Sequence, residues 1–131
     1  MAVKITKKEI EATSKLEAAA RYQYFIKKVA DTEKMYSLVD EGGDWAIACF
    51  GEKTLFSVWS APEFAAACAV SEWKGFSVRE FNIDDFESDI FNEIDTHDHL
   101  INVFSVKGRS GFLVDYNEFA RDLSDELRKH Q

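Results

Sequence analysis

The sequence predicts a single α+β domain in which helices pack on a mixed, mainly antiparallel sheet. Its 131 residues are close to the commonest length of one domain. Short apolar runs of the strand type alternate with longer segments in which apolar residues recur at helical spacing. The chain has six Gly, one Pro and no linker-like tract. We therefore expect residues 1–131 to form one domain with the element order ααβββαβαββα.

The N-terminal segment is expected to be helical. Thr6 and Glu9 have the spacing of a capping box, and the segment after them is typical of one broken helix or two short ones. Its second part carries apolar residues at the i, i+3, i+4, i+7 spacing of one helix face: Tyr22, Phe25, Ile26 and Val29. This face is predicted to lie in the core.

Three short strands are expected next, at residues 35–39, 45–50 and 55–59. Segments rich in Gly, Asp and Glu separate these apolar runs and favour turns between them. The three strands are predicted to form a meander. An Ala-rich helix then begins at Pro62, a residue suited to the first helical position, and is expected to extend to about Trp73.

The second half of the chain is expected to alternate strands and helices. Residues 76–83 alternate as a strand, and Asp84 with Glu87 has the spacing of a capping box for an amphipathic helix. A hairpin is expected within residues 100–114, with its turn at residues 107–110. Asp115 begins a final helix with apolar residues at positions 119, 123 and 127.

A parallel pairing is expected within this order. The strand, helix and strand from Leu55 to Ile83 would form a right-handed parallel crossover, whereas the hairpins are antiparallel. Cys49 and Cys68 lie among apolar neighbours without the C-x-x-C spacing. We therefore expect two buried free thiols in the layer between the sheet and the helices.

The charge of the chain is unevenly distributed. The formal net charge is −8, and residues 80–106 contain no Lys or Arg. Eight acidic residues lie in this stretch: Glu80, Asp84, Asp85, Glu87, Asp89, Glu93, Asp95 and Asp98. A surface built from them repels phosphate, which excludes nucleic acid as a partner there, and it suits docking of a basic protein. The alternative is the solvated outer face of an amphipathic helix.

Several function classes lack their usual motifs. The sequence has no G-x-S-x-G elbow, no P-loop and no G-x-G-x-x-G. We therefore assign no catalytic residue and expect no cofactor. The longest apolar stretches fall far short of the roughly 20 residues of a membrane span, and the first residues lack the apolar region of a secretion signal. We expect a cytoplasmic protein that does not bind a membrane.

One segment suggests a metal site. Asp95, His97 and His99 supply carboxylate and imidazole groups that bind divalent metals. His97 and His99 are two residues apart, so they share a side only if the segment is extended. The other histidine is His130, near the end of the chain. The alternative is a polar loop between a helix and a strand.

Trp73 is the candidate aromatic residue of a partner surface, because Trp is enriched at binding hot spots. A helix that starts at Pro62 places Glu72 and Trp73 about three turns away, so helix geometry alone does not bring them to Trp59. The alternative is that both Trp side chains pack in the core while Glu63 and Glu72 face solvent.

Two motifs resemble a known family. Residues 21–31, Arg-Tyr-Gln-Tyr-Phe-Ile-Lys-Lys-Val-Ala-Asp, form the first. The second begins with Trp-Ser-Ala-Pro-Glu-Phe-Ala at residues 59–65 and continues through Cys68 to Glu-Trp-Lys-Gly at residues 72–75. Together they are similar to the bacterial family of domain of unknown function 2750, over nearly the whole chain. The resemblance implies a small single-domain protein and carries no assigned chemistry.

These features favour a non-enzymatic protein-interaction or regulatory module. In this hypothesis the protein is of the immunity or inhibitor type, and its acidic helix and the loop after it face a basic protein. The alternative is a small-ligand-binding protein or an enzyme whose pocket combines residues from separate strands, which a single sequence does not reveal.

Overall fold

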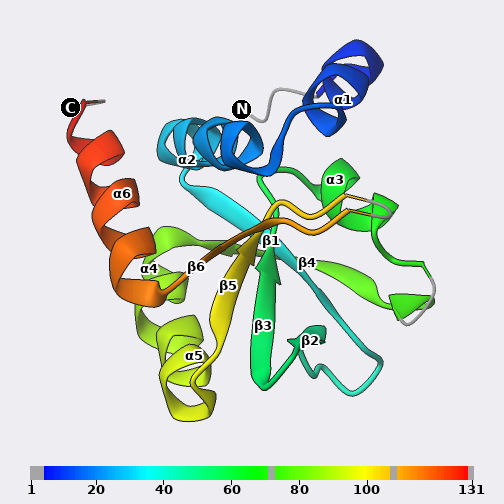
Figure 1. The fold of residues 1–131 in the computed structure, drawn as a ribbon, viewed down its shortest axis with the longest axis vertical. Coiled ribbons are helices and arrows are strands. Elements are labelled where there is room, and N and C mark those ends of the chain that lie inside the picture. The colour runs from blue at the N-terminus through cyan, green and yellow to red at the C-terminus, as the bar shows by residue number, and fades with distance from the viewer. Residues whose placement is uncertain (1–4, 71–72, 107–108, 130–131) are drawn as a thin grey trace.

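The computed structural model describes residues 5–70, 73–106 and 109–129 (Figure 1). The helical segments are α1 (Lys7–Ser14), α2 (Ala18–Thr32), α3 (Pro62–Ala67), α4 (Ile83–Asp85), a π-helical turn (Phe86–Ile90), α5 (Phe91–His97) and α6 (Tyr116–Lys129). The strands are β1 (Lys34–Val39), β2 (Ile47–Phe50), β3 (Lys53–Val58), β4 (Ser77–Asn82), β5 (Leu100–Val103) and β6 (Phe112–Val114). The α+β class and the expected element order are confirmed.

Local signals account for the first two helices. Thr6 Oγ1 accepts a hydrogen bond from the Glu9 backbone N–H at 3.1 Å, so the expected cap is present. The chain turns after α1 and begins α2 at Ala18, which gives two helices and not one broken helix. The predicted apolar face of α2 is buried in the core: Tyr22, Phe25, Ile26 and Val29.

The predicted meander is wrong in its first strand. β2 and β3 form the expected antiparallel hairpin, but β1 pairs antiparallel with β4 in a separate two-stranded sheet. β1 contacts the larger sheet through isolated bridges, one of which joins Tyr36 to Trp59, and through a hydrogen bond from the Ser37 hydroxyl to the Ser57 backbone oxygen of β3. β4 offers β1 a ladder of six residue pairs from Lys34↔Asn82 onward, whereas β2 has four residues. The longer ladder satisfies more backbone groups.

The predicted parallel crossover is also wrong, because the parallel neighbour of β3 is β5 and not β4. The four-stranded sheet has the order β2-β3-β5-β6. A parallel crossover needs a helix that carries the chain back along the strand. The six residues of α3 span about 9 Å, whereas the six of β3 span about 20 Å. The return to β5 therefore includes β4 and the helical segments after it.

α3 ends at Ala67, well before Trp73. The Cys68 N–H bonds to the Ala65 backbone oxygen at 3.0 Å, a tightened last turn. Trp73 and Phe76 then close two further turns, through backbone bonds from Trp73 to Val70 and from Phe76 to Trp73. Residues 71 and 72 lie outside the described chain, and with them the Glu72 of the predicted helix.

We define residues 83–97 as the acidic helix. It begins two residues earlier than predicted. Its cap is Asn82, whose Oδ1 accepts the Asp85 N–H at 2.7 Å, and not Asp84. α4, the π-helical turn and α5 follow without a break. Its apolar residues are turned inward, as expected for an amphipathic helix: Ile83, Phe86, Ile90 and Ile94 are buried and Phe91 is half-buried.

The C-terminal part follows the sequence signals closely. β5 and β6 form the expected antiparallel hairpin, with residues 107 and 108 of its turn outside the described chain. Asp115 Oδ1 accepts the Glu118 N–H at 2.8 Å and so caps α6. Figure 1 shows α6 beside the acidic helix and α2. Phe119 of α6 contacts both of these helices, because its ring centroid lies 5.3 Å from that of Phe86 in the acidic helix and 5.8 Å from that of Phe25 in α2.

Candidate functional site

The outer face of the acidic helix carries a row of carboxylates that point to solvent. Six of the predicted partner-binding residues in and just after this helix are exposed: Asp84, Asp85, Glu87, Asp89, Asp95 and Asp98. Within the described chain, the first five make no ion pair, and Asp98 lies 3.5 Å from Lys53 Nζ. The structure thus brings these residues to one helical surface whose negative charge is largely unneutralised.

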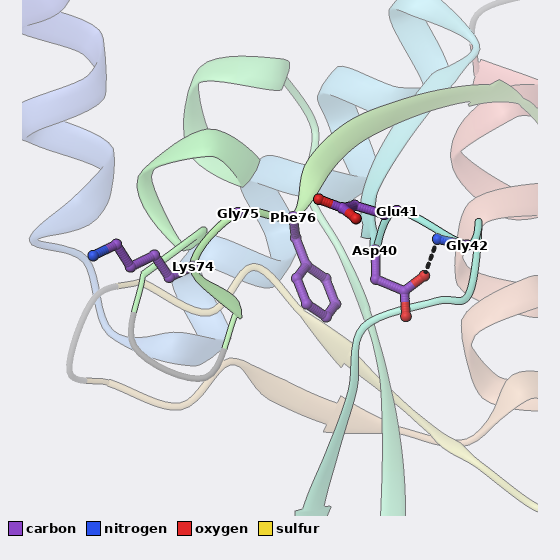
Figure 2. Close-up of a pocket in the computed structure, with 6 residues that line it drawn as sticks. All are labelled: Asp40, Glu41, Gly42, Lys74, Gly75 and Phe76. Carbon is purple, nitrogen blue, oxygen red and sulfur yellow. Dashed lines mark hydrogen bonds between the residues drawn. The ribbon is translucent and has the colours of Figure 1, made fainter.

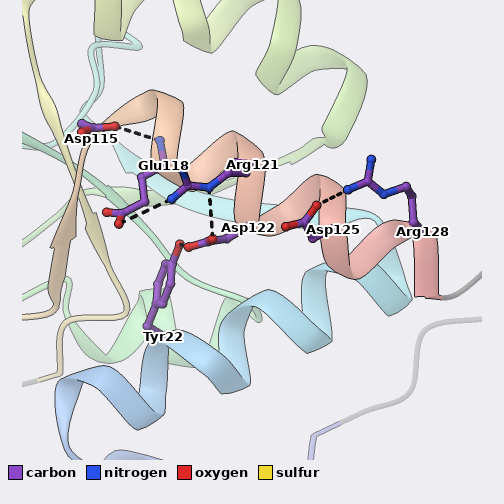
Figure 3. A network of polar contacts seen from close by, with 7 residues as sticks. All are labelled: Tyr22, Asp115, Glu118, Arg121, Asp122, Asp125 and Arg128. Carbon is purple, nitrogen blue, oxygen red and sulfur yellow. Dashed lines mark hydrogen bonds and ion pairs between the residues drawn. The ribbon is translucent and has the colours of Figure 1, made fainter.

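α6 shows the opposite arrangement, which Figure 3 displays. Glu118 lies 3.8 Å from Arg121, and Asp125 is paired with Arg128, both at i,i+3 spacing on the helix surface. Asp122 accepts a hydrogen bond from the Tyr22 hydroxyl at 2.6 Å. The carboxylates of α6 are therefore used within the fold, whereas five of the acidic helix, at residues 84, 85, 87, 89 and 95, make no ion pair within the described chain.

Two histidines at the end of the acidic helix converge on one carboxylate. Glu93 Oε2 lies 2.9 Å from His97 Nδ1 and 2.8 Å from His99 Nε2. The two imidazole rings are stacked, with centroids 5.3 Å apart. His99 is buried, and its Nδ1 lies 2.6 Å from Thr54 Oγ1 on β3. One possible ligand atom from each of Glu93, His97 and His99 lies within 4.8 Å of the others.

Sequence reasoning chose Asp95 as the carboxylate beside the histidines, and the structure places Glu93 there. Asp95 is exposed, and among the described residues it does not belong to the cluster. The sequence held a signal for Glu93, because Glu93 and His97 are four residues apart on a helix and so share a face. His99 follows Asp98, which has φ 53° and ends the helix in the left-handed conformation. This turn of the backbone places His99 beside Glu93, and the spacing of the residues did not reveal it.

Trp73 lies on another part of the molecule. Figure 1 shows the segment before β4 on the opposite side of the strands from α4 and α5. Trp73 is half-buried and packs edge-on against Trp59 with centroids 6.3 Å apart. Trp59 is fully buried, and its indole N–H donates to the Ser105 backbone oxygen. Because α3 ends early and the chain turns back, the two Trp residues meet, contrary to the straight-helix geometry.

Trp73 borders a groove of about 540 Å³ on the four-stranded sheet. Its wall includes the exposed apolar side chains Phe50 and Val70 and both cysteines. Cys68 is buried, as predicted, and burial raises the pKa of its thiol. Cys49 is exposed, so the prediction of two buried thiols is wrong for that residue. Cys49 belongs to β2, which is the edge strand of the sheet and whose end is open to solvent.

A second hollow, of about 340 Å³, lies between the β1–β2 turn and residues 74–76. Figure 2 shows the Lys74 amine pointing away from Asp40 and Glu41. Asp40 Oδ1 accepts hydrogen bonds from the backbone N–H groups of Gly42 and Asp44, both at 2.9 Å. The Asp40 carboxylate therefore stabilises the turn through these hydrogen bonds, and the hollow lacks the convergent polar groups of a ligand site.

Fold and site together define a small α+β domain with an acidic helical face and a histidine–carboxylate cluster at its end. The chain belongs to the DUF2750 family, described as proteins of unknown function, whose model matches residues 22–123. The match covers both motifs from which the resemblance was drawn, apart from Arg21 at the start of the first, and confirms the resemblance. A search of curated proteins finds no significant relative. Within the described residues, no helix combines the length and apolar character needed to cross a membrane.

Proposed function

We propose that this protein is a non-enzymatic interaction or regulatory module that presents its acidic helix to a basic protein. The supporting observation is the row of five exposed carboxylates from Asp84 to Asp95, which have no ion-pair partner in the described chain. Complementary charge speeds encounter with an oppositely charged partner and rejects acidic ones. An inhibitor-like role, in which this face covers a basic functional surface, is the specific form that we propose.

The helix dipole stabilises Asp84 and Asp85 in the first turn, but other features of this charge distribution cost the helix stability. Like charges three or four residues apart destabilise a helix by a few tenths of a kcal/mol per pair. Asp95 lies near the C-terminal end, where the helix dipole disfavours a negative charge. A role in binding accounts for this arrangement. The exposed thiol of Cys49 suits a reducing compartment, which is why we propose a cytoplasmic setting.

A pull-down that compares two charge-matched variants tests the proposal. The helix variant neutralises four carboxylates: Asp84→Asn, Asp85→Asn, Glu87→Gln and Asp89→Asn. The control variant neutralises four exposed carboxylates on other elements: Glu11→Gln, Asp31→Asn, Glu41→Gln and Glu52→Gln. Both change the net charge equally, so a difference between them reports position and not total charge. Circular dichroism and thermal unfolding establish that each variant is folded.

We expect the native chain to retain one basic protein at near-equal stoichiometry in about 50 mM NaCl and to release it at about 300 mM, where surface charges are strongly screened. The control variant should retain the same protein, and the helix variant should lose it. Retention that does not depend on salt, or equal capture by both variants, would show that the acidic helix is not the binding surface.

The groove beside Trp73 favours a second candidate function, binding of a small apolar ligand. Its volume of about 540 Å³ lies in the range of small-molecule sites, and Phe50 and Val70 supply exposed apolar surface. A thermal-shift screen of apolar metabolites tests this alternative. A compound that raises the Tm of the native chain but not that of Trp73→Ala would support this function. If no compound stabilises the native chain, this function is excluded.

A further inference from the structure

The cluster at the end of the acidic helix has a composition suited to a metal ion. Two imidazole nitrogens and one carboxylate oxygen lie within 4.8 Å of one another, and this is a ligand set that holds zinc in proteins. We propose that Glu93, His97 and His99 bind a divalent transition-metal ion of the zinc type. This site is separate from the exposed carboxylates on which the docking proposal rests.

Two of the three distances between ligand atoms are close to those of a metal-bound set, and the two histidine nitrogens lie within 4.8 Å of each other. At metal–ligand distances of about 2.0–2.1 Å, two ligand atoms of a tetrahedral zinc site lie about 3.3 Å apart. Glu93 Oε2 lies 2.8 and 2.9 Å from the two histidine nitrogens. Each pair therefore needs to separate by about half an ångström when a metal ion replaces the protons that they share. Small rotations of Glu93 and His97 supply this movement, because both lie on the helix surface.

The site also has the outer hydrogen bond that ordered metal ligands need. Metal-binding histidines usually bond through their second ring nitrogen to a fixed group, which sets the ring orientation. His99 does this through Nδ1, 2.6 Å from Thr54 Oγ1, and its side chain is only 5% exposed. Thr54 lies on β3, so this contact fixes His99 between the sheet and the helix end. Nε2 is thereby directed at Glu93.

The electrostatic surroundings favour a cation. The cluster is at the C-terminal end of the acidic helix, where the helix dipole is negative. The His97 side chain is 56% exposed, so one side of the bound ion would face solvent. Three protein ligands leave a fourth position for water or for a donor group of a partner.

Calorimetric titration of the metal-free full-length chain with ZnCl₂ tests this proposal, with MgCl₂ as a hard-cation control. We expect saturable zinc binding at a stoichiometry near one per chain and no saturable heat with magnesium. His97→Ala and Glu93→Gln should weaken zinc binding by about tenfold or more. Asp95→Asn and Asp89→Asn are the matched controls, since both remove a helix carboxylate outside the cluster, and they should keep near-native affinity. Titration with Co²⁺ adds a spectroscopic readout of imidazole coordination, which His97→Ala should abolish.

His97 is more than half exposed, so its replacement leaves the core intact, and thermal unfolding checks this. The absence of saturable zinc heat would overturn the proposal. Equal weakening by Asp95→Asn and His97→Ala would overturn it as well, because it would show diffuse attraction to the acidic surface. The variants of the pull-down experiment retain Glu93, His97 and His99. A negative pull-down would therefore not affect the zinc-binding results.

Discussion

The guanidinium group of Arg21 donates a 2.6 Å hydrogen bond to the backbone oxygen of Phe104, 83 residues further along the chain. It also donates to the backbone oxygens of Ser110, at 3.2 Å, and Leu16, at 3.1 Å. Arg21 is 1% exposed, and within the described chain its partners are carbonyl groups and not carboxylates. Burial lowers the pKa of this guanidinium, which nevertheless stays charged. Arg21 therefore ties α2 to the β5–β6 hairpin.

Replacement of this arginine should be strongly destabilising. Lysine is a point charge without a planar fork, so Arg21→Lys cannot reach all three carbonyl groups. Lost hydrogen bonds to a buried charge should lower the free energy of unfolding by about 3 kcal/mol, which urea denaturation measures. Arg121→Lys is the control: that side chain is 68% exposed, and its effect should stay within about 0.5 kcal/mol. Equal stability of the two variants would contradict this role of Arg21.

Gly111 lies where the two sides of the β5–β6 hairpin approach each other too closely for a side chain. A Cβ there would be 2.5 Å from Asn102 Oδ1 and 2.5 Å from the Val103 backbone oxygen. Gly111→Ala should therefore cost about 1–3 kcal/mol of unfolding free energy. Gly42→Ala, whose Cβ would meet its nearest atom at 3.4 Å, should be nearly neutral. A neutral Gly111→Ala would mean that the hairpin tolerates a wider spacing.

The two cysteines should differ sharply in reactivity. Cys49 is exposed, whereas Cys68 is 7% exposed and its thiol donates to the Ser105 backbone oxygen at 3.4 Å. A thiol reagent such as Ellman's should label one thiol rapidly in the native chain and both after unfolding. Cys49→Ser should remove the rapid phase. Rapid labelling of both thiols in the folded protein would contradict the burial of Cys68.

The raised pKa values of the tyrosines predict that the protein loses stability at alkaline pH. Desolvation raises the pKa of all four, with Tyr36 at about 12, and neighbouring carboxylates raise them further. The unfolded chain loses its phenolic protons first, near pH 10, so the free energy of unfolding should fall as pH rises above about 10.

Spectrophotometric titration of phenolate absorbance measures this effect. We expect the native chain to titrate at higher pH than the same chain in concentrated guanidinium chloride. Tyr22→Phe removes the hydroxyl that donates to Asp122 and should reduce the alkaline loss of stability. Coincident titration curves for the folded and unfolded chains would count against the buried environment of these rings.

Short-range signals predicted much of the fold. The caps at Thr6 and Asp115 and the apolar stripe of α2 are confirmed, because each depends on residues within one or two helical turns. The unneutralised acidic face also follows from local composition, since residues 80–106 contain no Lys or Arg. The cap of the acidic helix shifted by two residues to Asn82, which offers the same kind of side-chain acceptor as Asp84.

Local patterns in the amino-acid sequence were enough to predict which segments become helices and strands, which helix faces are apolar, and where the charge gathers. The pairing of β1 with β4, the parallel arrangement of β3 and β5, and the contact of Arg21 with Phe104 follow from the three-dimensional packing. The same packing brings Thr54 to His99 and holds His99 against Glu93. Local patterns depend on neighbours within a few residues, whereas strand partners and buried polar contacts are set by competition among groups distant in the sequence, which the chain resolves only when it packs.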